Sequence, residues 1–199
     1  STVFNHLLVS PNHLVNTLFD YLDIEIANAK EKKEAYIIAK MNGLNDEGMI
    51  EKLYEASQAG VDVQLIVRGI CSLRPGVPGL SDNIKAISVV DKYLEHSRVY
   101  IFCNGGEEKC YISSADWMER NLRRRIEVAC PIYDPKLVAR LKKILSFQWH
   151  DNVKARIHNQ ELGNPFKPKG EKILRAQNET YDYFKNLLED ENTDNHTAA

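Results

Sequence analysis

Residues 61–67 read VDVQLIV, and this short stretch decides the fold. Apolar side chains stand at every second position from Val61 to Val67, and Ile66 adds another on the opposite side. A run that is apolar on both sides is typical of a strand buried on both faces, as in a parallel sheet. The stretch therefore predicts an internal strand in a sheet that helices cover.

The segments before this strand repeat the order of a helix followed by a strand. Ser10 and Pro11 are typical of a helix start, with serine as the cap and proline at the first helical position, and apolar residues then recur at helical spacing to about residue 32. Residues 36–41 form an apolar run of strand length, and residues 42–46 turn the chain into a second helix that Gly60 ends. This order predicts an α/β fold in a single domain.

The second half of the chain contains more strand-like runs than helical ones. Strands are predicted at 84–90, 98–103, 109–113 and 126–132, and the turn at 104–106 joins the middle two in a hairpin. A helix from 134 to about 149 should turn four side chains inward, namely Leu137, Leu141, Ile144 and Leu145. A last helix is expected at about 171–188, followed by a disordered acidic tail at 189–199. The loop 68–82, rich in glycine and proline, is expected to be functional or disordered.

The composition excludes several classes of protein. The 199 residues are 43% apolar, which suits one domain that folds without disulfides or metal ions to hold it together. A formal net charge of -2 excludes a generally cationic nucleic-acid binder. No apolar run approaches the ~20 residues of a membrane span. The four cysteines lack the paired spacing of a zinc site or a disulfide framework. We therefore expect a cytoplasmic protein and, since the chain starts at Ser1 without methionine, a fragment of a longer one.

One pair of residues suggests acid–base or phosphoryl chemistry. His96 and Arg98 stand two apart at the start of a predicted strand, where alternate side chains point to the same side. They could face one phosphate, with the imidazole exchanging a proton or a phosphoryl group and the guanidinium neutralising charge. The alternative is a histidine at a strand edge that bonds a neighbouring carboxylate.

Two further segments could bind phosphate. Residues 113–121 follow a strand and begin with small hydroxylated side chains that can bind phosphate oxygens, although a capped turn before a short helix is the alternative. Arg68 stands at the carboxyl end of the strand 61–67, where parallel sheets bind ligands and a guanidinium can hold a phosphate bidentately. A surface salt bridge is the alternative for Arg68. The arginine-rich run 120–125 is most typical of a solvated face, with some members left as phosphate contacts.

These segments resemble known families. The pair His96 and Arg98, followed by a glycine turn, a strand and SSADW at 113–117, resembles the phospholipase D signature H-x-K-x4-D, with Arg98 in place of lysine and Cys103 in place of aspartate. A longer match, over nearly all of residues 7–188, resembles the long-chain polyphosphate kinases. It runs through LIVRGICSLRPG at 65–76, YLEHSR at 93–98 and YISSADWM at 111–118.

The resemblance to the polyphosphate kinases implies a fold and an activity. Residues 1–188 would be the second, C-terminal catalytic domain of such a kinase, a phospholipase D-like mixed sheet flanked by helices. The activity would be reversible transfer of the terminal phosphate of ATP to inorganic polyphosphate through a phosphohistidine, with magnesium. The phosphohistidine and the magnesium ligands would belong to the first catalytic domain, so no metal ligand is expected in this chain.

The same resemblance assigns roles to single residues. His96 would be the second catalytic histidine, facing the phosphohistidine across a cleft. The expected contacts to the nucleotide phosphates are Arg68, Arg98, Ser113, Ser114, Asp116, Arg120 and Asn121. The expected partners are ATP, ADP, polyphosphate and the other domains of the same kinase, in a homo-oligomer that binds no nucleic acid. Peripheral association with the inner membrane stays open.

Two other functions stay open beside the kinase. One is a phospholipase D-like phosphodiesterase or nuclease in which two single-motif subunits dimerise, which the missing lysine and aspartate of the signature disfavour. The other is a phosphate-binding module without catalysis.

Overall fold

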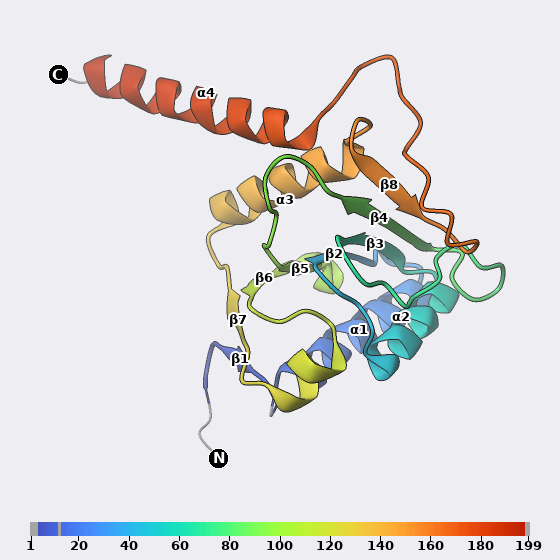
Figure 1. Ribbon diagram of the computed structural model, residues 1–199. Coiled ribbons are helices and arrows are strands. Elements are labelled where there is room, and N and C mark those ends of the chain that lie inside the picture. Colours follow the sequence, from blue (N-terminus) through green and yellow to red (C-terminus); the bar gives the residue numbers. More distant parts are fainter. Residues whose placement is uncertain (1–3, 12, 198–199) are drawn as a thin grey trace.

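A mixed sheet forms the centre of the computed structural model, which describes residues 4–11 and 13–197 except for the side chains of 190–197 (Figure 1). In this part of the chain the sheet has eight strands, in the order β1-β7-β6-β5-β2-β3-β4-β8. The strands are β1 (Leu8–Val9), β2 (Tyr36–Met41), β3 (Asp62–Val67), β4 (Ile84–Val89), β5 (Val99–Phe102), β6 (Lys109–Ser113), β7 (Val128–Pro131) and β8 (Ala155–His158). The helices are α1 (Leu14–Lys30), α2 (Glu47–Ala59), α3 (Pro135–His150) and α4 (Ala176–Thr197), with short turns η1 (Asn104–Gly106) and η2 (Arg120–Arg124).

Strand β3 lies inside the sheet, as its sequence predicts. It pairs in parallel with β2 on one side and β4 on the other, whereas the other pairings between the named strands are antiparallel. Leu65 belongs to a core shared with α1 and α2, while Ile66 belongs to a second core shared with α3. The predicted α/β mixed sheet flanked by helices is therefore confirmed.

Helix α2 begins and ends where the sequence signals place it. The Asp46 side chain accepts a hydrogen bond from the Met49 amide at 3.0 Å, which satisfies one free donor of the first turn. Gly60 has a φ of +101°, and this left-handed conformation favours glycine. Met49 and Leu53 then point into the core between α2 and the sheet.

The predicted start of the first helix is wrong. Helix α1 begins at Leu14 with His13 as its N-cap, not at the Ser10 and Pro11 pair. The Ser10 hydroxyl points away from the helix toward the carbonyl oxygens of Asn121, 2.6 Å away, and Arg125, 2.8 Å away, and so does not cap α1. Ser10 therefore ties the N-terminal segment to η2.

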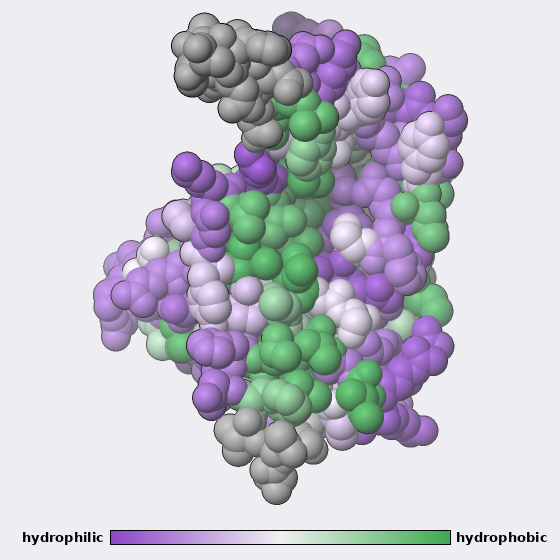
Figure 2. Space-filling model, turned by 90° about the vertical axis from the view of Figure 1, so that its left-hand side faces the viewer, coloured by the Kyte–Doolittle hydropathy of each residue, from purple (hydrophilic) through white to green (hydrophobic). Residues whose placement is uncertain are grey.

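Helix α3 covers only part of its sheet face. Its inward stripe consists of Val138, Leu141 and Leu145, and Leu137 stands one position off that stripe. Leu137 is therefore 45% exposed, which corrects its predicted inward orientation. Beyond the helix the sheet stays uncovered at β6 and β7, where Ile112 is 42% exposed. Figure 2 shows the resulting apolar area on the face that carries these strands and the start of α3.

Two short strands and the bounds of the last helix were not predicted. β1 has two residues and β8 has four, too few for a readable alternation of apolar and polar residues. Helix α4 begins at Ala176 rather than near 171, because buried Asp151 accepts a hydrogen bond from the Ala176 amide at 2.7 Å.

Helix α4 also continues to Thr197, past the expected end at residue 188 and through most of the expected disordered tail. No glycine or proline interrupts 176–197, and an ion pair between Lys185 and Glu189 spans the expected end. Residues 198–199 of that tail lie outside the described residues. The division into a domain at 1–188 and a tail at 189–199 stays a prediction.

Candidate phosphate-binding site

The topology of the sheet brings distant residues to one rim. The parallel strands β2 and β3 end at this rim, and the antiparallel strand β5 begins there. Asn42 and Arg68 directly follow β2 and β3, while Arg98 directly precedes β5 and His96 lies two residues before Arg98. Ligands of open α/β sheets bind beyond the carboxyl ends of parallel strands. The rim is therefore the expected place for a ligand in this fold.

His96 and Arg68 are in contact at this rim. One terminal nitrogen of Arg68 lies 3.2 Å from Nδ1 of His96, and Nε of Arg68 donates to Oδ1 of Asn42 at 3.0 Å. A guanidinium can only donate hydrogen bonds, so Nδ1 of His96 accepts, and the neutral ring carries its proton on Nε2. His96 is exposed and Arg68 is half-buried, so both groups can reach a ligand.

A buried ion pair between Arg98 and Asp116 supports Arg68 through Asn42. Arg98 donates two parallel hydrogen bonds to Asp116, at 3.1 and 3.0 Å, and the side chains are only 13% and 7% exposed. Asp116 also accepts from the backbone amide of Asn42 at 2.6 Å. Burial raises the pKa of Asp116, but the hydrogen bonds from Arg98 and Asn42 more than offset it and hold the pKa below its ordinary value.

Arg98 thus has a partner that sequence reasoning missed. Its guanidinium is held by the Asp116 carboxylate and by the carbonyl of His96, to which it donates at 3.0 Å. The two residues expected to contact phosphate, Arg98 and Asp116, instead satisfy each other in the described structure. Their contact with phosphate stays a prediction.

The remaining expected contacts lie in a neighbouring network. Ser114 donates to the Glu127 carboxylate, and buried Asn121 donates to the same carboxylate at 2.6 Å. Ser113 donates to the Val128 carbonyl at 3.2 Å, which ties the end of β6 to β7. Within residues 4–11 and 13–197, no hydrogen bond joins these side chains to His96 or Arg68.

The arginine run is divided between paired and free side chains. Arg123 makes a two-point ion pair with buried Asp46, at 2.7 and 2.9 Å, and Arg124 pairs with Glu119 at 2.6 Å. Arg120 and Arg125 are exposed, and none of the described residues makes a hydrogen bond or ion pair with either side chain. These two members of the run are therefore free to meet an anion.

The loop that carries His96 is held by the C-terminal part of the chain. Gln177, at the start of α4, accepts from the Tyr93 amide at 3.1 Å and donates to the Tyr93 carbonyl at 2.9 Å. The Glu95 carboxylate accepts hydrogen bonds from Gln177 at 3.2 Å and from Gln148 of α3. These partners are more than 50 residues from the loop in sequence, so no local pattern announces them.

Replacing Gln177 with alanine should loosen this loop without unfolding the domain. We expect backbone amides at 93–97 to exchange with deuterium about 5- to 30-fold faster, since the three lost hydrogen bonds contribute about 1–2 kcal/mol in all. Hydrogen exchange followed by mass spectrometry measures this. The control is Asn178→Ala, the next residue on α4, whose exposed side chain makes no hydrogen bond with the described residues of the loop. Equal exchange in the two variants would contradict the assigned role of Gln177.

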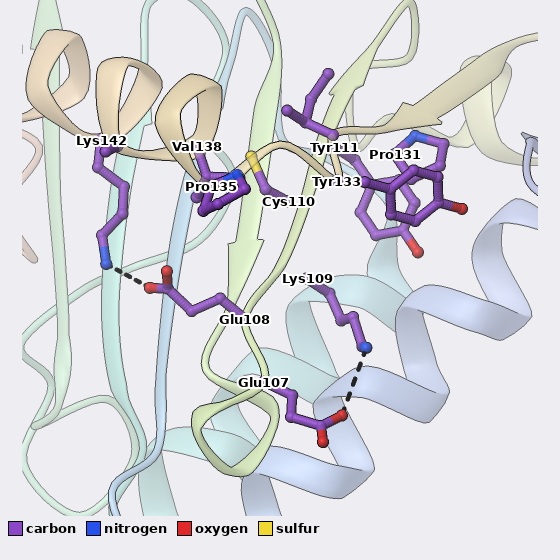
Figure 3. Close-up of a pocket in the computed structure, with 12 residues that line it drawn as sticks. Glu107, Glu108, Lys109, Cys110, Tyr111, Pro131, Tyr133, Pro135, Val138 and Lys142 are labelled. Atoms are coloured by element: carbon purple, nitrogen blue, oxygen red, sulfur yellow. Dashed lines mark hydrogen bonds and ion pairs between the residues drawn. The ribbon is translucent and has the colours of Figure 1, made fainter.

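A second hollow lies at the opposite rim and differs in character. It has a volume of about 590 Å³ and lies between the start of β6, the residues after β7 and α3 (Figure 3). Its charged side chains point toward one another, with Lys142 paired to Glu108 and Lys109 paired to Glu107 at 3.9 Å. Because these cations are already neutralised, the rim with His96 is the better phosphate site.

The described residues offer no evident place for a metal ion. No group of three or more histidine, cysteine, aspartate or glutamate side chains in them is arranged to hold one. Asp116 at this rim is bound to Arg98 and Asn42. Among the same residues, none of the helices combines the length and apolar character needed to cross a membrane.

The fold defines the class of protein first. Nuc from Salmonella typhimurium, a phospholipase D family member, superposes with a TM-score of 0.55 over 77% of this chain and 96% of Nuc, at 15% sequence identity. At this identity the likeness shows a phospholipase D-like fold and nothing about activity. The chain belongs to the family described as polyphosphate kinase C-terminal domain 2, whose family model matches residues 7–177.

Individual relatives agree with this membership. The polyphosphate kinase of Escherichia coli is 50% identical over 189 residues, which are 94% of this chain and 28% of that protein. That of Vibrio cholerae is 50% identical over 185 residues, 92% of this chain and 26% of that protein. The crystal structure of polyphosphate kinase from Porphyromonas gingivalis superposes with a TM-score of 0.90 at 46% identity, over 94% of this chain and 29% of that chain. This chain thus spans less than a third of the length of these relatives, and the predicted family is confirmed.

Proposed function

We propose that this chain is the second catalytic domain of a polyphosphate kinase and contributes His96 and Arg68 to reversible phosphoryl transfer between ATP and polyphosphate. The observation that supports it most is the 3.2 Å contact between the Arg68 guanidinium and the His96 imidazole at the exposed rim of the sheet. Asn42 accepts from Nε of Arg68 and His96 accepts from one terminal N–H, which leaves the other three N–H groups of the guanidinium to bind phosphate oxygens. The pair therefore combines charge neutralisation with a proton donor.

The two residues divide the work of the transfer. In the forward direction the bond between the terminal phosphorus of ATP and the β-phosphate oxygen breaks, and a bond forms to a histidine nitrogen of the preceding domain. Arg68 neutralises the negative charge that develops on the β-phosphate oxygen, and Nε2–H of His96 donates a hydrogen bond or its proton to that oxygen. In the second half of the cycle the phosphorus leaves the histidine and bonds to the terminal oxygen of polyphosphate. His96 is exposed in this chain, so water must be excluded from the site by the domain that faces it.

The other rim residues take supporting and guiding roles in this proposal. Arg98 and Asp116 hold Asn42 and, through it, Arg68, whereas Ser113, Ser114 and Asn121 shape the segment between β6 and η2. Arg120 supplies a free cation for the polyphosphate chain. The proposal further includes ATP with magnesium as substrate and the other kinase domains as partners. It also includes a homo-oligomer and a cytoplasmic location with peripheral membrane association. These parts rest on the family alone.

Replacing Arg68 with alanine should weaken phosphate binding. A hydrogen bond between charged groups is worth about 1.5–3 kcal/mol, so we expect Kd for tripolyphosphate to rise about 10- to 100-fold. Isothermal titration calorimetry of the chain measures the change. Arg74→Ala is the matched control, because Arg74 is an exposed arginine of the loop that follows Arg68. An equal loss of affinity in both variants would point to nonspecific charge instead of a site.

The kinase and phosphodiesterase functions make opposite predictions. The full-length kinase that carries this chain should gain acid-labile phosphate when incubated with ATP labelled in its terminal phosphate. It should not hydrolyse bis-p-nitrophenyl phosphate, because Cys103 stands at the aspartate position of the phospholipase D signature and lies buried beyond the far end of β5. Hydrolysis of the diester without a labelled protein would favour the phosphodiesterase.

A further inference from the structure

We propose that Lys40 is a positioning residue for His96, whose ammonium group holds the two peptide carbonyls that flank the histidine and so fixes the imidazole at the phosphate site. The catalytic meaning of this assignment rests on the proposed function. The contacts themselves do not.

The geometry places Lys40 directly beneath the His96 loop. Lys40 is the fifth residue of β2 and is opposite Val99, the first residue of β5. Its Nζ donates to the Ser97 carbonyl at 3.0 Å and approaches the Glu95 carbonyl at 3.5 Å. The side chain is only 3% exposed, so Lys40 acts on a ligand through the loop and not by touching it.

The loop is thereby held from two sides. Lys40 binds its backbone from the sheet, and Gln177 and Gln148 bind the Glu95 side chain from α4 and α3. Among the described residues, no backbone–backbone hydrogen bond fixes 91–97, which lie between the end of β4 at Val89 and Arg98, whose carbonyl accepts from the Ser113 amide of β6 at 3.0 Å. Side-chain contacts such as that of Lys40 therefore set the position of His96.

The burial of Lys40 and the cations near it lower the pKa of its ammonium group toward neutral pH. Burial lowers its pKa to about 8, Arg68 and Arg98 lower it as well, and Glu95 and Asp116 oppose the change. Four elements contribute these groups, namely the ends of β3 and β6, the start of β5 and the His96 loop. Above pH 8 the amine becomes neutral, and its hydrogen bonds to the two carbonyls weaken because they are no longer charge-assisted.

The expected loss of His96 positioning at high pH differs from unfolding. The folded-state pKa of Lys40 lies below the ordinary value of 10.5, so between about 8 and 10.5 the unfolded chain binds more protons than the folded one. This group therefore makes the fold more stable as pH rises through that window. A change at His96 near pH 8 would thus reflect the loop and not the global fold.

Nuclear magnetic resonance tests the coupling in the 199-residue chain without any assay of kinase activity. We expect the Lys40 ε-methylene and the His96 ring carbon signals to move together with a midpoint near pH 8. In Lys40→Met the His96 step near pH 8 should vanish, whereas the control Lys85→Met, an exposed strand lysine, should keep it. Persistence of the step in Lys40→Met, or its absence from the wild-type chain, would overturn the proposal. Should Lys40→Met fail to fold, the wild-type titration still decides.

Kinetics of the full-length kinase then separate positioning from phosphate binding. A misplacement of about 1 Å can cost about 10²-fold in rate, so we expect Lys40→Met to lower kcat about 10- to 100-fold with KM for ATP within about threefold. A large rise in KM with unchanged kcat would contradict a positioning role. If the proposed kinase function is wrong, there is no kcat to compare. The resonance experiment needs no turnover and still tests whether Lys40 positions His96.

Discussion

Replacing His96 with alanine in the full-length kinase that carries this chain abolishes polyphosphate synthesis, with an expected fall in kcat of about 10²- to 10⁴-fold. The imidazole supplies the proton donor at the leaving oxygen, and no other described side chain at this rim offers a comparable group. Arg68, the side-chain partner of His96 among the described residues, keeps its bond to Asn42 in the variant. The measurement is the initial rate of polyphosphate formation from ATP.

Folding should survive this substitution, because His96 is exposed and packs into no core. Circular dichroism and thermal unfolding of the variant provide the check. His150→Ala serves as the matched control, since His150 is an exposed histidine of α3 that bonds only within its own helix. Turnover near that of the wild type in His96→Ala would refute the catalytic role.

Replacing Asp116 with alanine destabilises the fold, with an expected loss of about 3–5 kcal/mol in the free energy of unfolding. The reason is that the Arg98 guanidinium then stays buried without its carboxylate, and the Asn42 amide loses its acceptor. Chemical denaturation gives the value. Glu119→Ala is the control, because Glu119 pairs with Arg124 at the surface, where the two side chains are 57% and 73% exposed and such a pair contributes about 0–1 kcal/mol.

The Asp116 effect should also depend on pH in a defined direction. The folded-state pKa of Asp116 lies below its ordinary value of 3.8, so its stabilisation is fully present above that value and is lost as pH falls through the lowered pKa. The stability difference between wild type and Asp116→Ala should therefore shrink in strong acid and stay constant from pH 5 to 7. A difference that does not change down to pH 2 would contradict this account.

Local signals explain which elements the sequence predicts. β3 follows from a run that is apolar on both sides, α2 from Asp46 and Gly60, and the β5–β6 hairpin from the glycine turn, all within a few residues of one another. Ser10 shows the limit of such signals. It has the residue type of a helix cap, but carbonyls more than 110 residues away bind its hydroxyl, so the helix starts at Leu14.

The residues of the site likewise include some that local signals predict and some that they do not. The sequence places Arg68 at the carboxyl end of a parallel strand, where such sheets bind ligands, and its contact with His96 lies at that rim. The pairing of Arg98 with Asp116 was not expected, because these residues are separated by a hairpin and carry no local pattern. The buried position of Lys40 could not be read from the sequence either, since a lysine near the end of an apolar strand usually points to solvent.

The most direct test of a shared site is a titration of the 199-residue chain with tripolyphosphate, followed by resonance signals of the Arg68 guanidinium and the His96 ring. Both signals should move with a single dissociation constant, and the Arg74 guanidinium should stay unchanged. Movement of only one of the two signals, or different dissociation constants for them, would contradict the claim that they form one phosphate site.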